Sequence, residues 1–307
     1  MAGLEKEYVK CNLCGADDYT FVWKGQESDL APKDIYSSSK GVMSKDTLVR
    51  CKKCGLMYVN PRFKSEVIVD AYAEAEDEVY ISQAENRMDT FKRGLDFIES
   101  AAKLKKGRIL DVGCASGFFL KVARDRGWDV EGVEPNKWLV KWGNEQYGLS
   151  MKATTMRGAN FADASFDVIT MWDVLEHTPD PDSELREAYR LLKKGGYLLV
   201  NIPDSGSSLA RVFGRRWWFV LSVHLFYFTA KTLRAMLVKN GFQVAVQKRY
   251  FQTLSLGYLI RMLKHLAKNP VGSIASDTMG SVARVLRMEK FPMTYYAGQT
   301  LFLVRKE

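Results

Sequence analysis

The sequence predicts an α/β fold organised around a doubly wound, mostly parallel β-sheet. From residue 106 to residue 250, short apolar segments alternate with amphipathic ones, as strands alternate with helices in such sheets. The segment RILDVGCASGFFL (108–120) runs from an apolar strand through a turn of small residues into a helix. Two Cys-x-x-Cys pairs near the N-terminus add a small metal-binding module to this prediction.

The alternating segments give the order of the predicted elements. The predicted strands are Arg108–Asp111, Asp129–Glu134, Phe166–Trp172 and Tyr197–Ile202, with a weaker strand near 150–154. The predicted helices are Phe118–Arg126, Lys137–Tyr147, Ser183–Leu192 and Ala230–Lys239. Glycine shortly follows each of these helices, as it commonly does at helix ends. Successive strands joined by helices pair in parallel, so we expect one central sheet.

The flanking regions divide the chain further. Residues 64–105 carry apolar side chains at helical spacing, and we expect a helical linker or cap there. Two later strands, Phe242–Tyr250 and Gln299–Arg305, are separated by a segment that we expect to be a helical insertion, 251–298. The predicted organisation is a metal module over 1–63, the helical linker, a core of 106–250 plus 299–307, and this insertion.

The composition is that of an ordinary globular protein. The chain has 307 residues, 47% of them hydrophobic and 26% charged. It contains no apolar run of transmembrane length, and its first residues lack the apolar core of a signal peptide, so we expect a cytoplasmic protein. The net charge of +9 comes from short, scattered basic clusters, which leaves acidic substrates, anionic membranes and RNA all open as partners.

The turn after the first predicted strand has the form of a cofactor site. Parallel strands deliver their carboxyl ends to the sheet edge where ligands of open α/β folds bind. The pattern here is D-x-G-x-x-x-G, formed by Asp111, Gly113 and Gly117. A dinucleotide fingerprint would need glycine at 113, 115 and 118, but Ala115 and Phe118 occupy two of these positions. Glu134 ends the second strand, where a carboxylate can accept both hydroxyls of a ribose.

Together with FDVITMWDVLEH and LLKKGGYLLVNIP, these motifs make residues 108–250 resemble a class I S-adenosylmethionine-dependent methyltransferase. The flanking motifs CxxCG…CxxCGLMYVNPR and HLFYFT are similar to those of a subgroup with an N-terminal zinc knuckle, whose members often act in sugar or glycan biosynthesis. Others with similar cores methylate quinone precursors. The resemblance implies a Rossmann-like sheet that ends in an antiparallel hairpin, here Phe242–Tyr250 with Gln299–Arg305.

The resemblance also implies which residues bind the cofactor. Asp111 should orient its methionine amino group, and Glu134 should bind the ribose hydroxyls. Met156 stands where an acid often meets the adenine, and it could pack on the ring instead. The full predicted set is Asp111, Gly113, Cys114 (a small residue filling the turn), Gly117, Glu134, Met156, Trp172 and Asp173, the last two facing the methionine end.

Histidine is the usual base near neutral pH if the acceptor is a hydroxyl or an acidic carbon. His177 follows the fourth strand directly and is the first candidate; His224 and Tyr227 are the others. His265 is interpreted as a surface residue. The sequence does not decide which candidate is the base.

The cysteine pairs form C-x₂-C-x₃₆-C-x₂-C through Cys11, Cys14, Cys51 and Cys54. Two CxxCG turns complete a tetrahedral thiolate site with no open position, which predicts structural zinc; iron of the rubredoxin type has the same ligands. The residue spacing between the pairs predicts a sizeable loop that leaves the site.

Several acceptors fit the sequence. The aromatic and basic segment RVFGRRWWFVLSVHLFYF suits a phosphate, a sugar face or a lipid chain, and an amphipathic stretch at 251–270 could touch a membrane. The leading hypothesis is O- or C-methylation of a sugar, nucleotide sugar or lipid-linked glycan precursor. The alternatives are an RNA methyltransferase, a quinone- or polyketide-type O-methyltransferase, and a non-catalytic binding module. The residues W-D-V-L after the fourth strand lack the N-P-P-Y-like motif of base-amine methylation.

Overall fold

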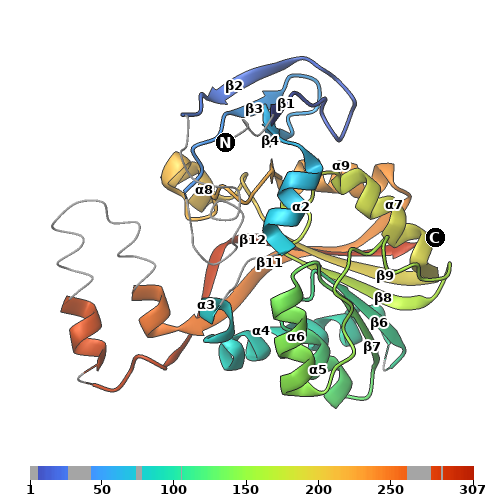
Figure 1. The fold of residues 1–307 in the computed structure, drawn as a ribbon, viewed down its shortest axis with the longest axis vertical. Coiled ribbons are helices and arrows are strands. Elements are labelled where there is room, and N and C mark those ends of the chain that lie inside the picture. The colour runs from blue at the N-terminus through green and yellow to red at the C-terminus, as the bar shows by residue number, and fades with distance from the viewer. Residues whose placement is uncertain (1–5, 27–42, 74–77, 105, 261–277, 285) are drawn as a thin grey trace.

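The computed structural model describes residues 6–26, 43–73, 78–104, 106–260, 278–284 and 286–307, and its centre is a six-stranded sheet of order β11-β12-β9-β8-β6-β7 (Figure 1). The strands are β6 (Arg108–Val112), β7 (Asp129–Val133), β8 (Phe166–Trp172), β9 (Leu192–Pro203), β11 (Phe242–Ser255) and β12 (Pro292–Lys306). The pairs β6–β7, β6–β8 and β8–β9 are parallel, whereas β12 pairs antiparallel with both β9 and β11. The predicted parallel sheet with a final antiparallel hairpin is confirmed.

Helices cover both faces of this sheet. On one face lie α4 (Ala84–Ala102) and α5 (Phe118–Asp125), together with aromatic residues of α6 (Lys137–Tyr147). On the other face lie α7 (Pro181–Leu191) and α9 (Ala230–Lys239). Most of the expected apolar positions of the 64–105 region are buried, among them Ile68, Leu95 and Ile98, whereas Val67 and Tyr72 are half-buried. The amphipathic patterns predicted that the apolar faces of these helices would be buried against the two faces of the sheet.

Two boundaries differ from the sequence-based expectation. The weak strand near 150–154 is a single bridge, between Lys152 and Val133. The ends of the expected insertion 251–298 are wrong, because β11 continues to Ser255 and β12 begins at Pro292. Strand residues such as Phe251–Tyr296 and Thr253–Thr294 pair across the hairpin, and these aromatic and β-branched residues favour strands. Residues 256–260 and 278–284 between them are helical, and His265 lies outside the described residues.

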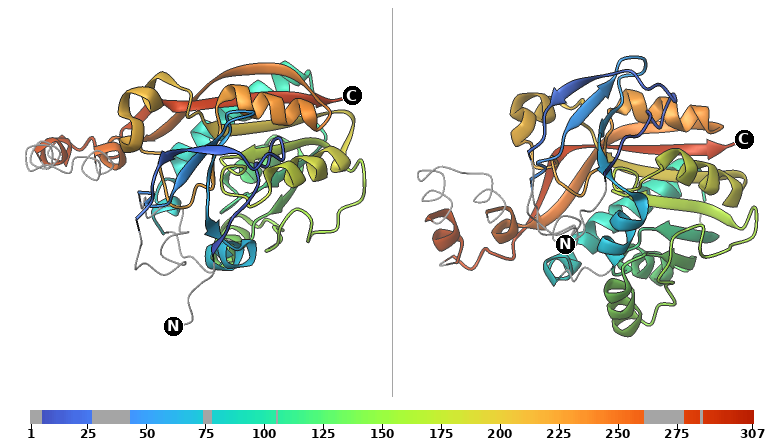
Figure 2. Two further views of the ribbon diagram at one scale, coloured as in Figure 1. Left: turned by 90° about the horizontal axis from the view of Figure 1, so that it is seen from above. Right: turned by 45° about the horizontal axis from the view of Figure 1, so that its top comes forward.

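The N-terminal region forms a second, four-stranded sheet of order β10-β4-β3-β2, drawn in blue above the core in Figure 1. Its strands are β2 (Tyr19–Trp23), β3 (Leu48–Cys51), β4 (Met57–Val59) and β10 (Phe226–Tyr227); β1 (Lys6–Glu7) and β5 (Arg62–Phe63) pair beside it. Because β10 comes from the chain after β9, this sheet is completed by residues of the core region. Figure 2 shows the same region from above and with its top tilted forward.

Short helices join the two sheets. They are α2 (Ser65–Ala73), α3 (Glu78–Ile81), α8 (Ser208–Phe213) and the 3-10 helix η1 (Gly214–Arg216). One continuous apolar cluster contains Leu56 and Tyr58 of the N-terminal region as well as Val112 and Leu185 of the core. The two regions therefore share one packed interior rather than touching at a polar surface.

Candidate active site

A cavity of about 610 Å³ opens at the carboxyl ends of the parallel strands. Its floor is made by residues that end β6, β7 and β8, and its walls come from α4, from residues 218–224 and from the β11–β12 hairpin. This is the edge at which open α/β sheets bind ligands. Predicted residues from distant parts of the chain meet here: Asp111, Gly113, Cys114, Glu134, Met156, Trp172, Asp173, His177 and His224 all line the cavity.

The turn between β6 and α5 is shaped by glycine. Gly113 has a φ of +66°, and a Cβ atom there would lie 2.8 Å from the Val174 side chain. Gly117 has a φ of +75°, and a Cβ atom there would lie 2.5 Å from Leu149. Both positions therefore require glycine for conformation and for space. Gly113 lines the cavity, whereas Gly117 is not among its lining residues, and the predicted contact of Gly117 with the cofactor stays a prediction.

Two buried carboxyl groups stand at the strand ends. Asp111 accepts a hydrogen bond of 2.7 Å from the Thr170 hydroxyl, and burial raises its pKa to about 8. Glu134 accepts backbone hydrogen bonds from Ala115 (3.1 Å) and Asn136 (2.8 Å). Burial raises the pKa of Glu134 to about 7, and these N–H donors oppose that rise. The backbone donors fix the orientation of the Glu134 carboxyl group. Both carboxyl groups are suited to bind the cationic or hydroxyl groups of a ligand.

The other predicted cofactor residues have different surroundings. Met156 is 1% exposed and lines the cavity floor. The Cys114 thiol lies 3.5 Å from the Met151 sulfur, as expected of a small filler. The Trp172 ring packs against Phe91, Phe119 and Tyr250, with centroids 5.4–5.6 Å away, so most of it belongs to the core.

Asp173 lines the cavity and is held at one of its carboxyl oxygens by amide side chains. Its Oδ1 accepts hydrogen bonds of 2.7 Å from Asn201 and from Gln299, and Gln252 donates in turn to Gln299. Burial raises the pKa of Asp173 to about 7. Its φ of +52° is a left-handed conformation at the end of β8. This amide network ties the β11–β12 hairpin to the cavity floor.

Glu176, His177 and His224 form a polar cluster in the cavity lining, which we call the acceptor triad. Their ligating atoms lie within 4.8 Å of one another, and the two imidazole centroids are 4.6 Å apart. Both carboxyl oxygens of Glu176 and Nδ1 of His177 are buried without a hydrogen-bond partner, so they are available to a ligand. His224 Nδ1 hydrogen-bonds with the Phe219 carbonyl at 2.8 Å. Glu and His side chains are also common ligands of divalent metal ions.

Burial keeps both imidazoles of the triad neutral. It lowers the pKa of His177 to about 4, and it lowers that of His224 well below the ordinary value, with the neighbouring His177 adding to the effect. A neutral imidazole can accept a proton. Burial likewise raises the pKa of Glu176 well above its ordinary value.

Tyr227, the third catalytic candidate, does not line the cavity. It lies in β10, and its hydroxyl donates a hydrogen bond of 3.1 Å to the Leu221 carbonyl. Strand alternation explains the error, because β10 pairs with β4 and turns this side chain toward Trp23 and the N-terminal sheet.

The sequence analysis missed several cavity residues. Glu176 stands in the quoted DVLEH motif, immediately before a residue that was predicted. Arg87, on α4, and Tyr250, Gln252 and Tyr295, on the terminal hairpin, had no motif to reveal them. Their role depends on packing between elements that lie far apart in the sequence.

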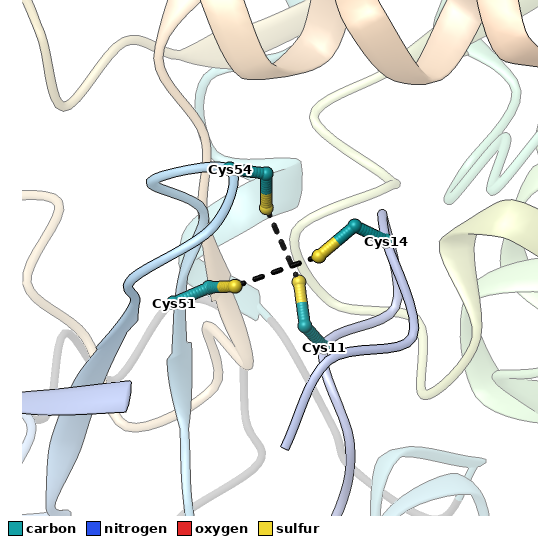
Figure 3. A group of neighbouring side chains, drawn as sticks. All are labelled: Cys11, Cys14, Cys51 and Cys54. Atoms are coloured by element: carbon teal, nitrogen blue, oxygen red, sulfur yellow. Dashed lines mark hydrogen bonds between the residues drawn. The ribbon is translucent and has the colours of Figure 1, made fainter. Parts of the chain in front are cut away.

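The four cysteines of the N-terminal pairs converge as predicted, with all four sulfurs pointing to one centre (Figure 3). Cys11 and Cys54 sulfurs are 3.4 Å apart, and those of Cys14 and Cys51 are 3.5 Å apart. The two turns match: Gly15 donates to the Cys11 carbonyl, Gly55 to the Cys51 carbonyl, and both glycines have φ near +75° (71° and 80°). We call this set the cysteine cluster. Four converging sulfurs fit a tetrahedral metal ion.

Hydrogen bonds connect the cysteine cluster to the acceptor triad. Asn12, between the first two cysteines, donates to Asp180 (2.8 Å) and accepts from the Asp182 backbone (2.9 Å). Arg62 donates to the Pro179 carbonyl at 2.8 Å. The backbone of Leu225, next to His224, donates to the Glu176 carbonyl and accepts from Val59. The N-terminal sheet thus holds both segments that carry the triad.

Comparison with known proteins agrees with this geometry. Residues 80–247 match the family described as a methyltransferase domain. The chain belongs to this family. The methyltransferase is 36% identical over 113 residues to the ubiquinone biosynthesis O-methyltransferase of Hahella chejuensis, which covers 35% of this chain and 48% of that protein. For the protein of the same description from Pseudomonas aeruginosa (strain UCBPP-PA14), identity is 27% over 113 residues, with 35% and 49% covered.

The methyltransferase spans about half the length of the curated relatives it matches. Among solved structures, a SAM-dependent methyltransferase from Archaeoglobus fulgidus is similar with a TM-score of 0.50 and 17% identity, covering 75% of this chain and 100% of that chain. This likeness supports the Rossmann-like fold. Among the described residues, no helix has both the length and the apolar character needed to cross a membrane.

Proposed function

We propose that the protein transfers a methyl group from S-adenosylmethionine to a hydroxyl group of a small-molecule acceptor. The observation that carries this proposal is one cavity whose lining contains both the buried carboxyl groups at the strand ends and the acceptor triad with its unpaired polar atoms.

The residues at the strand ends fit the cofactor. The Glu134 carboxyl would receive the ribose hydroxyls, and Asp111 would receive the amino group. A side chain at Gly113 would collide with Val174, so the turn beneath the proposed cofactor site needs glycine at this position. Met156 offers an apolar contact for the adenine ring. When bound, the cofactor supplies a methyl group activated by its sulfonium.

The acceptor triad would supply the general base and align the acceptor hydroxyl for methyl transfer. Nδ1 of His177 has no partner, so it can accept the proton of the acceptor hydroxyl while that oxygen forms its bond to the methyl carbon. Glu176 can receive a hydrogen bond from, or donate one to, a neighbouring hydroxyl. His224 is fixed through Phe219 and lies edge-on to His177, which orients the pair. The buried wall excludes water from the transfer.

The acceptor is proposed to be a hydroxylated ring, and a quinone-type ring ranks before a sugar. The relatives of this chain are described as O-methyltransferases of ubiquinone biosynthesis. In addition, the aromatic residues Trp218, Phe219 and Tyr258 line the cavity, where they can pack against a ring. A nucleotide sugar or lipid-linked glycan remains the second candidate. RNA is not favoured, because the cavity has five carboxyl groups but, among the described lining residues, one cation, which suits a polyanion poorly.

The cysteine cluster is proposed to hold structural zinc. Burial raises the pKa of Cys54 to about 11 and also raises that of Cys11, so a cation is needed to hold four thiolates together. Four sulfur ligands leave no coordination position for a substrate. We further propose a cytoplasmic protein in which residues 1–63 act as the metal module of the catalytic core.

Calorimetric titration with S-adenosylmethionine and S-adenosylhomocysteine tests the cofactor assignment. We expect micromolar binding by the zinc-loaded protein and at least tenfold weaker binding by Glu134→Ala, because the ribose loses its partner. The matched control is Glu131→Ala, on the same strand but outside the cavity. Absence of binding by the folded protein would refute the proposal. Methyl transfer from labelled cofactor to catechols and to nucleotide sugars then separates the two acceptor classes.

A further inference from the structure

Part of the cavity lining is apolar and comes from two regions that lie far apart in the sequence. We call this part the apolar wall, and it consists of Met43, Trp218, Phe219, Leu221 and Val223. None of these side chains carries a charge or a hydroxyl group, and the indole nitrogen of Trp218 is their one nitrogen or oxygen atom. A ligand group that packs against such side chains is stabilised by burial of its hydrocarbon surface.

The apolar wall continues directly from the acceptor triad. The Phe219 ring is stacked on the His224 imidazole, with centroids 6.3 Å apart and planes 19° apart. The Phe219 carbonyl hydrogen-bonds with His224 Nδ1 at 2.8 Å, and the Trp218 ring packs against that of Phe219 at 6.4 Å. An acceptor whose hydroxyl group reaches the triad therefore brings its neighbouring atoms to the apolar wall.

The N-terminal region supplies Met43 and fixes its position. Met43 forms an antiparallel bridge with Leu221, and the Ser44 backbone N–H donates to the Val220 carbonyl at 3.0 Å. The Ser222 hydroxyl donates to the Met43 carbonyl at 3.4 Å. These contacts attach Met43 to the segment that carries the rest of the wall. A methionine side chain is unbranched, so it can adapt its shape to a bound hydrocarbon group.

We propose that the apolar wall is an acceptor subsite for a hydrocarbon substituent of the methylated ring, and that Met43 makes the N-terminal region part of acceptor recognition. The proposal rests on the proposed function, which places the acceptor hydroxyl at the triad. It adds the class of acceptor, a hydroxylated ring that carries an alkyl or similar chain. A sugar or phosphate in the same place would bury polar groups against side chains that cannot hydrogen-bond them. The region that holds the cysteine cluster thus also selects the acceptor.

Calorimetric titration of the protein loaded with S-adenosylhomocysteine tests the subsite, with catechol and 4-alkylcatechols of increasing chain length as the probes. Each CH₂ group that leaves water for the wall should strengthen binding about threefold until the wall is covered. Met43→Ala should weaken the binding of 4-hexylcatechol by about 5- to 10-fold and leave that of catechol within about twofold of the wild type. Met43→Leu restores an apolar side chain of similar volume and should keep the wild-type affinities.

Met57→Ala is the matched control for effects on the N-terminal sheet. Met57 is buried in β4 of that sheet but does not line the cavity, so this variant should keep the wild-type dependence on chain length. Thermal unfolding verifies that each variant is folded. In methyl-transfer assays, kcat/KM for the same catechols should show the same preference for long chains and the same loss in Met43→Ala.

An affinity that does not depend on the length of the alkyl chain would overturn the proposal. An equal loss for catechol and 4-hexylcatechol in Met43→Ala would also overturn it, because the effect would then not be specific to the chain. Failure of the proposed function looks different, since the folded protein would then not bind S-adenosylhomocysteine. In that case the same alkylcatechol titration of the ligand-free protein still tests the apolar wall.

Discussion

The cysteine cluster and the acceptor triad are both compact sets of ligating side chains, but they differ in what surrounds them. The cysteine sulfurs face one another, and each of the two Cys-x-x-Cys turns is closed by backbone hydrogen bonds of its own. The triad faces a cavity and leaves three buried polar atoms unpaired. A site closed by four protein ligands serves structure, whereas one that keeps positions open serves a ligand. From this comparison we expect the cysteine cluster to stabilise the fold and the acceptor triad to take part in the chemistry.

The largest effect on stability is expected from disrupting the cysteine cluster. Cys11→Ser removes a buried ligand, and we expect loss of the metal and a fall of more than about 4 kcal/mol in the free energy of unfolding. Metal content by mass spectrometry and denaturant unfolding measure the two effects. Cys114→Ala is the control, since that cysteine is buried outside the cluster and should retain the metal. A metal-free Cys11→Ser protein with wild-type stability would contradict the structural role.

Disrupting the acceptor triad should leave the stability of the fold nearly unchanged and remove the methyltransferase activity. His177→Ala is expected to lower kcat by about 10²- to 10⁴-fold because the proton acceptor is lost. S-adenosylhomocysteine affinity should stay within about twofold of the wild type, because the proposed function assigns no cofactor contact to His177. Stopped-time assays with an identified acceptor and calorimetry give the two values. Full activity in His177→Ala together with loss in His224→Ala would transfer the base role to His224.

These two clusters also differ in how far the sequence could predict them. All four cysteines lie in two short turns, so local spacing alone specified the site. The triad joins residues 176–177 to residue 224. The two segments are brought together by backbone hydrogen bonds from Leu225 and Phe226 to the Glu176 carbonyl and by the pairing of β10 with β4. The same pairing turned Tyr227 away from the cavity, because neighbouring strand residues point to opposite faces.

The fold was predictable for the same reason that the cysteines were. Strand and helix periodicity is local, and it fixed the order of β6 to β9 and their helices. The extension of β11 to Ser255 was not predictable, because those residues are held as a strand by β12, some 40 positions later. Arg87 was missed because its place in the cavity depends on elements that lie far apart in the sequence.

A smaller effect is expected from pH at the cofactor end of the cavity. Burial raises the pKa of Glu134 to about 7, so its carboxyl is mostly protonated at pH 6 and mostly ionised at pH 8 in the ligand-free protein. Accepting two ribose hydroxyls favours the ionised form, so the affinity for S-adenosylhomocysteine should rise about tenfold from pH 6 to pH 8. Calorimetry at both pH values measures the change. Glu134→Gln should reduce the dependence to the part contributed by Asp111, whose pKa is about 8, and an unchanged slope in that variant would assign the dependence to a group other than Glu134.

The smallest effect is expected where the two clusters are coupled. Asn12→Ala removes both hydrogen bonds to residues 180 and 182, and we expect a loss of about 1–2 kcal/mol in stability and a fewfold fall in kcat/KM with unchanged metal content. The matched control is Asn144→Ala, which removes a similar pair of hydrogen bonds to the Met151 backbone, away from the triad. The imidazole NMR signals of His177 and His224 distinguish the variants: they should shift in Asn12→Ala and stay fixed in Asn144→Ala. Equal histidine spectra in both variants would show that the N-terminal sheet stabilises the fold without positioning the triad.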